Sequence, residues 1–120
     1  MEVSTYFTNL TDIQKAAETL KGVVVQTPLM FNLNMSKEHS ASVFLKREDL
    51  QTVRSYKIRG AYNKINSLSK EELMKGVVCA SAGNHAQGVA FSCKMKKSKG
   101  VIFMPNPTPQ QKIDQVKMFG

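Results

Sequence analysis

The chain has 120 residues, of which 42% are hydrophobic and 22% are charged. This length and composition suit one small globular domain and argue against a disordered or repetitive chain. The net charge of +8 raises nucleic acid and anionic membranes as partners. Much of the positive charge lies at the end of a predicted helix, in Lys94, Lys96, Lys97 and Lys99. Lysines there complement the helix dipole, and no stacking aromatic residues separate them, so we expect no nucleic-acid partner.

Cysteine and histidine usage excludes a structural metal centre. Cys79 and Cys93 form no CxxC motif, and only two histidines are present, so we predict no metal site. Both cysteines fall at apolar positions and are expected to be buried thiols in a reducing compartment. Residues 1–10 lack the pattern of a signal peptide, and no apolar run approaches the roughly 20 residues of a membrane helix. We therefore expect a cytoplasmic protein with no membrane partner.

The first half of the chain mixes helical and extended patterns. Thr11 is the predicted N-cap of a first helix, and Gln14 completes its capping box. The apolar face of this helix consists of Ile13, Ala16, Ala17 and Leu20. Gly22 is expected to end it, and an extended stretch at 23–25 then leads to a Thr-Pro-Leu segment at 27–29. A strand is predicted over residues 42–46.

Two further helices are predicted before residue 76. The longer begins near residues 55–57 and carries the apolar positions Ile58, Ala61, Ile65 and Leu68. The shorter has a capping box formed by Ser69 and Glu72, and it ends before Gly76.

From residue 76 onward, strands and helices alternate. We predict strands at 76–80 and 100–104, with a tight turn at 81–84 and a helix at 85–97 between them. Both strands are wholly apolar, which is typical of strands buried on both faces. Thr108 is the predicted N-cap of a last helix, with Pro109 at its first position.

This order of elements predicts an α/β fold with a parallel sheet and flanking helices. So few strands leave an edge and a face of the sheet uncovered. We therefore expect the fold to be incomplete in this chain.

The turn after the first of these strands is a candidate anion site. In a βα unit this turn faces the ligand crevice, and free backbone N–H groups at the helix start favour a carboxylate or phosphate. Ser81, Asn84 and His85 add side-chain donors, while Gly83 permits close approach of a ligand. Ordinary capping and turn chemistry explains the same residue types equally well. The segment matches neither the dinucleotide-binding nor the P-loop pattern.

Lys57 lies at the start of a predicted helix, beside apolar residues and close to Arg59. Partial burial and a neighbouring cation lower a lysine pKa and favour the neutral amine that forms an imine. A solvated lysine among 17 basic residues is the simpler interpretation. Composition and spacing alone do not single out Lys57.

Three segments, taken together, resemble the threonine dehydratase family. They are Leu45–Gln51, Arg54–Ala61 and Ala80–Gly88, and the Thr-Pro-Leu segment at 27–29 fits as well. The similarity extends over most of residues 22–120. It implies the tryptophan-synthase-β-like fold of type II pyridoxal-phosphate enzymes, with pyridoxal 5'-phosphate as the cofactor.

The resemblance also implies roles for individual residues. In this family the lysine matching Lys57 forms the imine link to the cofactor and is the catalytic residue. Tyr56 stands where phenylalanine is more usual, and a stacking role against the cofactor tolerates its hydroxyl. The asparagine matching Asn84 hydrogen-bonds the phenolic oxygen of the cofactor. The substrate carboxylate is held by the turn residues that match Ser81, Ala82, Gly83 and His85.

The implied reaction is an α,β-elimination that converts L-threonine, with L-serine as a further candidate, to a 2-oxo acid (2-oxobutanoate from threonine) and ammonia. Serine racemases are similar but carry a second serine where Ala82 stands. That serine is their acid–base group on the opposite face of the cofactor, so its absence favours elimination. Cysteine and threonine synthases continue the lysine motif with Asp-Arg, where this chain has Ile58-Arg59.

The family binds the cofactor phosphate with a glycine-rich loop, and these 120 residues contain no glycine cluster. Full-length members are longer, and biosynthetic dehydratases add a C-terminal regulatory module. We therefore expect residues 1–120 to be the N-terminal portion of a catalytic domain from a homo-oligomeric protein, and to be inactive alone. A non-catalytic remnant is the alternative.

Overall fold

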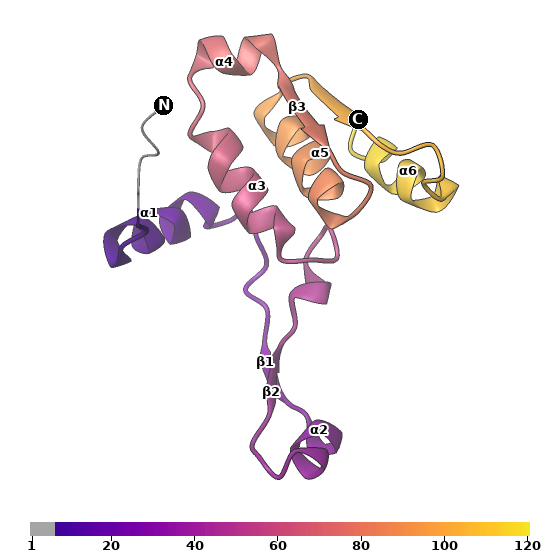
Figure 1. Cartoon of the computed structure of the whole chain (residues 1–120). Helices are drawn as coiled ribbons and strands as arrows, with labels where there is room; N and C mark the ends of the chain where they lie inside the picture. The colour runs from indigo at the N-terminus through magenta and orange to yellow at the C-terminus, as the bar shows by residue number, and fades with distance from the viewer. Residues whose placement is uncertain (1–6) are drawn as a thin grey trace.

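The computed structural model describes residues 7–120, so most of the segment considered for a signal peptide lies outside the described residues. The elements in chain order are α1 (Leu10–Leu20), β1 (Leu29–Phe31), α2 (Leu33–Glu38), β2 (Phe44–Lys46), a 3₁₀ helix (Glu48–Leu50), α3 (Lys57–Asn66), α4 (Lys70–Lys75), β3 (Val77–Ala80), α5 (Asn84–Lys96), β4 (Gly100–Phe103) and α6 (Gln110–Lys117). The β1–β2 hairpin with α2 at its tip extends away from a body in which α3, α5 and the β3–β4 pair gather (Figure 1). None of the helices within residues 7–120 is long and apolar enough to cross a membrane.

The β3–β4 pair forms the predicted parallel unit, with Val77 opposite Gly100 and Ala80 opposite Phe103. Helix α5 connects the two strands and packs against both of them. The prediction that both strands are buried on both faces was wrong, because Val78 and Phe103 are 68% and 62% exposed. Successive side chains alternate between the faces of a strand, and the described helices cover only one face of this short sheet.

The core lies between α3, α5 and the covered face of the sheet. Ile58, Ala61 and Ile65 are buried, which confirms three of the four positions predicted for the apolar face, whereas Leu68 lies beyond the end of α3 at Asn66. Together with Val89 and Cys93 of α5, Ala61 and Ile65 form one cluster. Partly buried side chains pack against this cluster from α4 and the strands: Leu73, Val77, Cys79 and Ile102. A fully buried aliphatic side chain stabilises a fold by roughly 1.5–3 kcal/mol, so this cluster holds α3 and α5 together.

The antiparallel β1–β2 hairpin was not predicted. Leu29 lies opposite Lys46 and Phe31 opposite Phe44, and the two phenylalanine rings meet edge to face at 5.5 Å. The strand predicted over 42–46 is confirmed for its last three residues. Between the strands, the side chain of Asn32 accepts a 3.0 Å hydrogen bond from the Met35 N–H and caps α2. Six residues are too few to show a helical apolar period, so sequence patterns could not indicate α2.

Helix caps differ from the predictions at two of three places. Helix α1 is capped by Asn9, which forms a reciprocal capping box with Asp12, and Thr11 lies inside the helix. Asparagine is as good an N-cap as threonine, and its reciprocal hydrogen bonds with Asp12 start the helix at Leu10. Helix α6 begins at Gln110 with Pro109 as its N-cap, because the Thr108 hydroxyl donates to the Pro105 carbonyl instead. The capping box of Ser69 and Glu72 is confirmed.

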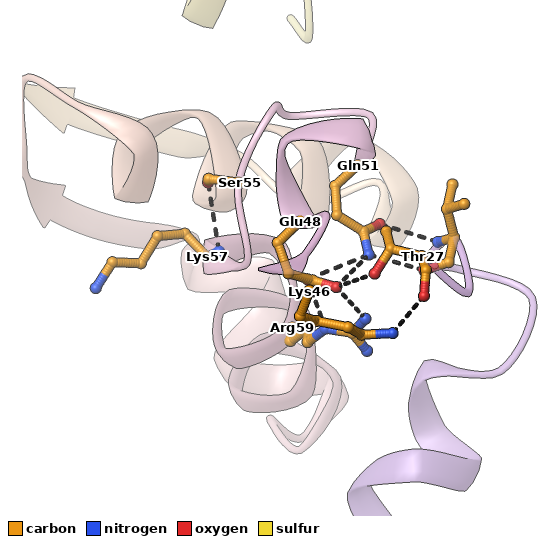
Figure 2. A network of polar contacts seen from close by, with 8 residues as sticks. Thr27, Lys46, Glu48, Gln51, Ser55, Lys57 and Arg59 are labelled. Carbon is orange, nitrogen blue, oxygen red and sulfur yellow. Dashed lines mark hydrogen bonds and ion pairs between the residues drawn. The ribbon is translucent and has the colours of Figure 1, made fainter. Parts of the chain in front are cut away.

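The Glu48 carboxylate is the centre of a buried polar network (Figure 2). Arg59 donates to both of its oxygens, at 2.7 and 2.8 Å. The Thr27 hydroxyl and the Gln51 amide also donate to it, and these two residues are only 3% and 2% exposed. The network therefore ties the segment before β1, the 3₁₀ helix and the first turn of α3 to one another.

The prediction of an extended stretch at 23–25 was wrong for its first two residues, which form a turn and a bend after α1, and the same network supplies the backbone partners of Val25. The Gln51 side chain accepts a hydrogen bond from the Val25 N–H at 2.9 Å and donates to the Val25 carbonyl at 2.8 Å. Lys46 donates to the Thr27 carbonyl. Backbone polar groups near the core need partners, and here side chains supply them in place of a neighbouring strand.

We predict that Glu48 makes the stability of the chain depend on pH. Hydrogen bonds from Arg59 outweigh burial and lower the pKa of Glu48 from 4.5 to about 2. A folded-state pKa below the unfolded one stabilises the fold fully at neutral pH, and this contribution is lost as pH falls from about 5 toward 2. Because Arg59 is about a third exposed, solvent screening reduces the effect to ~2 kcal/mol.

Glu48→Gln should therefore lower the free energy of unfolding at pH 7 by ~2 kcal/mol and flatten its acid dependence. Asp49→Asn is the matched control, because the ion pair of Asp49 with Arg47 is exposed and screened by solvent, so its loss should change stability far less. Urea unfolding followed by circular dichroism between pH 2 and pH 7 measures both. An acid profile of the Glu48 variant that matches the unchanged chain would contradict the prediction.

Candidate functional site

Lys57 is the first residue of α3, and the turn before it is unusual. Arg54 has a φ of +59°, a left-handed conformation that costs a non-glycine residue about 1 kcal/mol or more. This turn redirects the chain from the 3₁₀ helix into α3. Ser55 is buried, and its hydroxyl accepts a 3.4 Å hydrogen bond from the Lys57 N–H. The start of α3 is thus held by side chains of the segment that precedes it.

The ion pair of Arg59 with Glu48 sets the rotation of this first turn. Residues two positions apart on an α-helix point in directions roughly 200° apart. Because Arg59 is held by Glu48, Lys57 must face the other way. Figure 2 shows the Lys57 side chain extending away from the polar network.

Lys57 borders a surface hollow of about 260 Å³ between α3 and the start of α5. Its lining residues are Tyr56, Lys57, Gly60, Ala61 and His85. The Lys57 ammonium lies 5.1 Å from the centre of the Tyr56 ring, in cation–π contact. No carboxylate within residues 7–120 forms an ion pair with it, so the amine remains accessible to a ligand in the hollow.

The turn at 81–83 leads into α5 and is anchored to the sheet. The Ser81 N–H donates to the Phe103 carbonyl at 3.0 Å, and the Ser81 hydroxyl accepts from the Gly83 N–H at 3.3 Å. Gly83 is the N-cap of α5 and provides no side-chain cap. The N–H groups of the first turn are therefore available to an anion, which the helix dipole also favours. A Cβ atom built on Gly83 would meet nothing within 4 Å, so the space above the turn is open.

The structure brings only some of the predicted site residues around one hollow. Tyr56, Lys57 and His85 line it together. The remaining four occupy the adjoining turn and the first position of α5, outside the lining of the hollow: Ser81, Ala82, Gly83 and Asn84.

Sequence reasoning missed the residues that support this site. Glu48 and Arg59 both lie in the quoted motifs, but nothing in their 11-residue separation indicated that they pair. Gly60 and Ala61 also line the hollow, and their position one turn after Lys57 is the signal that could have found them.

A family model and curated proteins both match most of this chain. A family model described as pyridoxal-phosphate dependent enzyme matches residues 20–120. A biosynthetic L-threonine dehydratase of Halalkalibacterium halodurans is 62% identical over 109 residues, which cover 91% of this chain and 26% of that protein. The chain thus spans about a quarter of the length of the curated relatives it matches.

Solved structures agree with this assignment. The processed form of threonine deaminase isoform 2 from Solanum lycopersicum superposes with a TM-score of 0.80 at 40% identity, covering 94% of this chain and 32% of that one. Maize serine racemase superposes with a TM-score of 0.90 at 34% identity, covering 96% and 35%. These likenesses confirm the predicted α/β fold of type II pyridoxal-phosphate enzymes. The chain belongs to the family of pyridoxal-phosphate-dependent enzymes.

Proposed function

We propose that this chain carries the lysine-bearing part of the active site of a threonine dehydratase, with Lys57 as the residue that binds pyridoxal phosphate covalently. The observation that carries the proposal is the position of Lys57, an accessible amine at a hollow beside the uncapped start of α5. The 62% identity to a protein named biosynthetic L-threonine dehydratase points to the substrate. On this proposal the substrate is L-threonine and the products are 2-oxobutanoate and ammonia.

The residues around the hollow fit such a cofactor. A primary amine for the covalent link, an aromatic ring beside it and a space of about 260 Å³ are present together. The ring of Tyr56 is 59% exposed and free to stack on a flat ligand. Asn84 is exposed at the first position of α5, where its amide is available to a polar group of the cofactor.

Pyridoxal phosphate, when bound, supplies an electron sink for the α-carbon of an amino acid. We propose that residues of this chain supply two further contributions, proton transfer and binding of the substrate carboxylate. The Lys57 Nζ atom holds the cofactor and, once released, accepts the α-proton of the substrate. The Ser81–Gly83 turn and the first N–H groups of α5 bind the substrate carboxylate, with His85 beside them, and so orient that proton toward Lys57.

Racemisation is the second candidate function, because maize serine racemase gives the TM-score of 0.90. A racemase requires a second acid–base group to return the proton from the opposite face. Ala82 has a methyl side chain, which exchanges no proton, where the resemblance places the racemase serine. Elimination therefore remains the better supported reaction.

We further propose that the full-length protein is a cytoplasmic homo-oligomer. Burial raises the pKa of both free thiols, Cys79 and Cys93, and neutral unpaired thiols suit a reducing compartment. The exposed apolar face around Val78 and Phe103 is a surface that a larger assembly would cover.

A chimera tests the role of Lys57. This chain would replace the matched segment of the Halalkalibacterium halodurans dehydratase, which supplies the rest of a full-length enzyme. Lys57→Ala should abolish the visible absorbance of the bound cofactor and lower kcat for L-threonine at least a thousandfold, because the covalent attachment and the base are lost together. Lys64→Ala in the exposed last turn of α3 is the matched control and should keep both. Unchanged absorbance in the Lys57 variant would refute the assignment.

A second variant tests carboxylate binding by the turn. Gly83→Ala adds a methyl group to open space and should leave the thermal midpoint of the chimera within about 2 °C, because no atom lies within 4 Å. The same methyl group occupies the space above the free N–H groups, so KM for L-threonine should rise about tenfold or more. Steady-state kinetics measure the change in KM, and thermal unfolding measures the change in the midpoint. An unchanged KM would exclude this turn as the carboxylate site.

A further inference from the structure

Gly88 makes the tightest glycine contact at the interface of α3 and α5. These helices lie side by side (Figure 1), and Gly88 is buried between them. A Cβ atom at Gly88 would lie 3.0 Å from the carbonyl oxygen of Lys57, 3.2 Å from its carbonyl carbon and 3.2 Å from the Cβ of Ala61. Distances below 3.4 Å are closer than ordinary van der Waals contact, so only glycine allows this approach without a displacement.

The contact lies directly beneath the candidate site. Gly88 is four residues after Asn84, and Ala61 is four residues after Lys57, so each pair occupies one face of its helix. Side chains of a helix lean toward its N-terminus, and Lys57 and His85 therefore meet the hollow above the Gly88 contact. The buried Ser92 hydroxyl donates to the Gly88 carbonyl at 2.6 Å and holds this turn of α5 in place.

We propose that Gly88 is a positioning residue, whose missing side chain sets the distance between Lys57 and the turn at 81–85. This inference rests on the proposed function of Lys57. A Cβ atom at Gly88 would collide with the backbone carbonyl of Lys57 itself. Any side chain at this position therefore moves the proposed cofactor-binding lysine relative to the proposed anion site. A misplacement of about 1 Å costs on the order of a hundredfold in rate when reacting groups must be aligned.

The effect of Gly88→Ala on helix stability is opposite to its effect on the position of Lys57, so the two effects can be measured separately. Replacing an interior helical glycine by alanine stabilises a helix when no contact opposes it. Gly88→Ala should therefore fold, with its strain concentrated on the first turn of α3. Ala90→Gly is the matched control in the same helix, because it loses helix propensity without adding an atom near Lys57. Ala90 packs instead in the cluster with Ala86 and Val116.

The first measurement uses the 120-residue chain and does not depend on activity. In ¹⁵N-labelled protein, Gly88→Ala should shift the backbone amide signals of residues 55–61, and Ala90→Gly should shift those signals less than half as much. The second measurement uses the chimera. Gly88→Ala should lower kcat for L-threonine ten- to a hundredfold while KM changes less than threefold, and Ala90→Gly should keep kcat within twofold.

An equal loss of kcat in both variants, or no loss in Gly88→Ala, would overturn the inference. If Gly88→Ala does not fold, the double variant Gly88→Ala/Ala61→Gly repeats the comparison, since it removes the 3.2 Å contact between side chains. It should regain folding and retain the amide shifts near Lys57, and a spectrum without those shifts would also overturn the inference. Failure of the proposed function would be recognised by a different result, because the cofactor absorbance would then remain in the Lys57→Ala variant.

Discussion

The ion pair between Glu48 and Arg59 is the constraint on which the rest of the site depends. One carboxylate receives hydrogen bonds from three parts of the chain and joins them. A nearly buried carboxylate is unfavourable unless it is fully hydrogen-bonded, and the lowered pKa of Glu48 shows that its partners more than offset its burial. The pair also selects which side of α3 faces the polar network. As a consequence, the lysine two residues earlier faces the opposite side, toward α5.

A second constraint is the close packing of α3 on α5. Small residues on both helices let the backbones approach, with Gly88 against the carbonyl of Lys57 and near Ala61. The two constraints act on the same turn of α3: the ion pair holds it from one side and α5 holds it from the other. Such a turn has little freedom to move, and the proposed role of Lys57 requires this rigidity, because reacting groups must be aligned. The turn at 81–83 is anchored in a similar way, by the backbone hydrogen bond of Ser81 to the end of β4.

Structural similarity to solved enzymes indicates the fold of this chain but not the reaction. The TM-score is higher for a serine racemase, 0.90, than for a threonine deaminase, 0.80, whereas the sequence identities run in the opposite order, 34% and 40%. Backbone likeness reports how the helices and strands are arranged, and that arrangement serves several reactions. The choice between elimination and racemisation depends on single side chains that exchange protons. On the proposed function Ala82 is such a position, because its methyl group exchanges no proton.

The amino-acid sequence by itself determined the local elements with strong signals: the apolar periodicity of α3, the capping box of α4 and the two apolar strands with α5 between them. Through its motifs it also indicated the family and, by resemblance, predicted that Lys57 is the catalytic residue. Tertiary structure alone decided the rest, because those features arise between residues far apart in the chain. The pairing of Glu48 with Arg59 and the side-chain partners of the Val25 backbone depend on which segments meet, and no local pattern encodes that. The same holds for the hollow, which Tyr56 and His85 line together only because α5 packs against the first turn of α3.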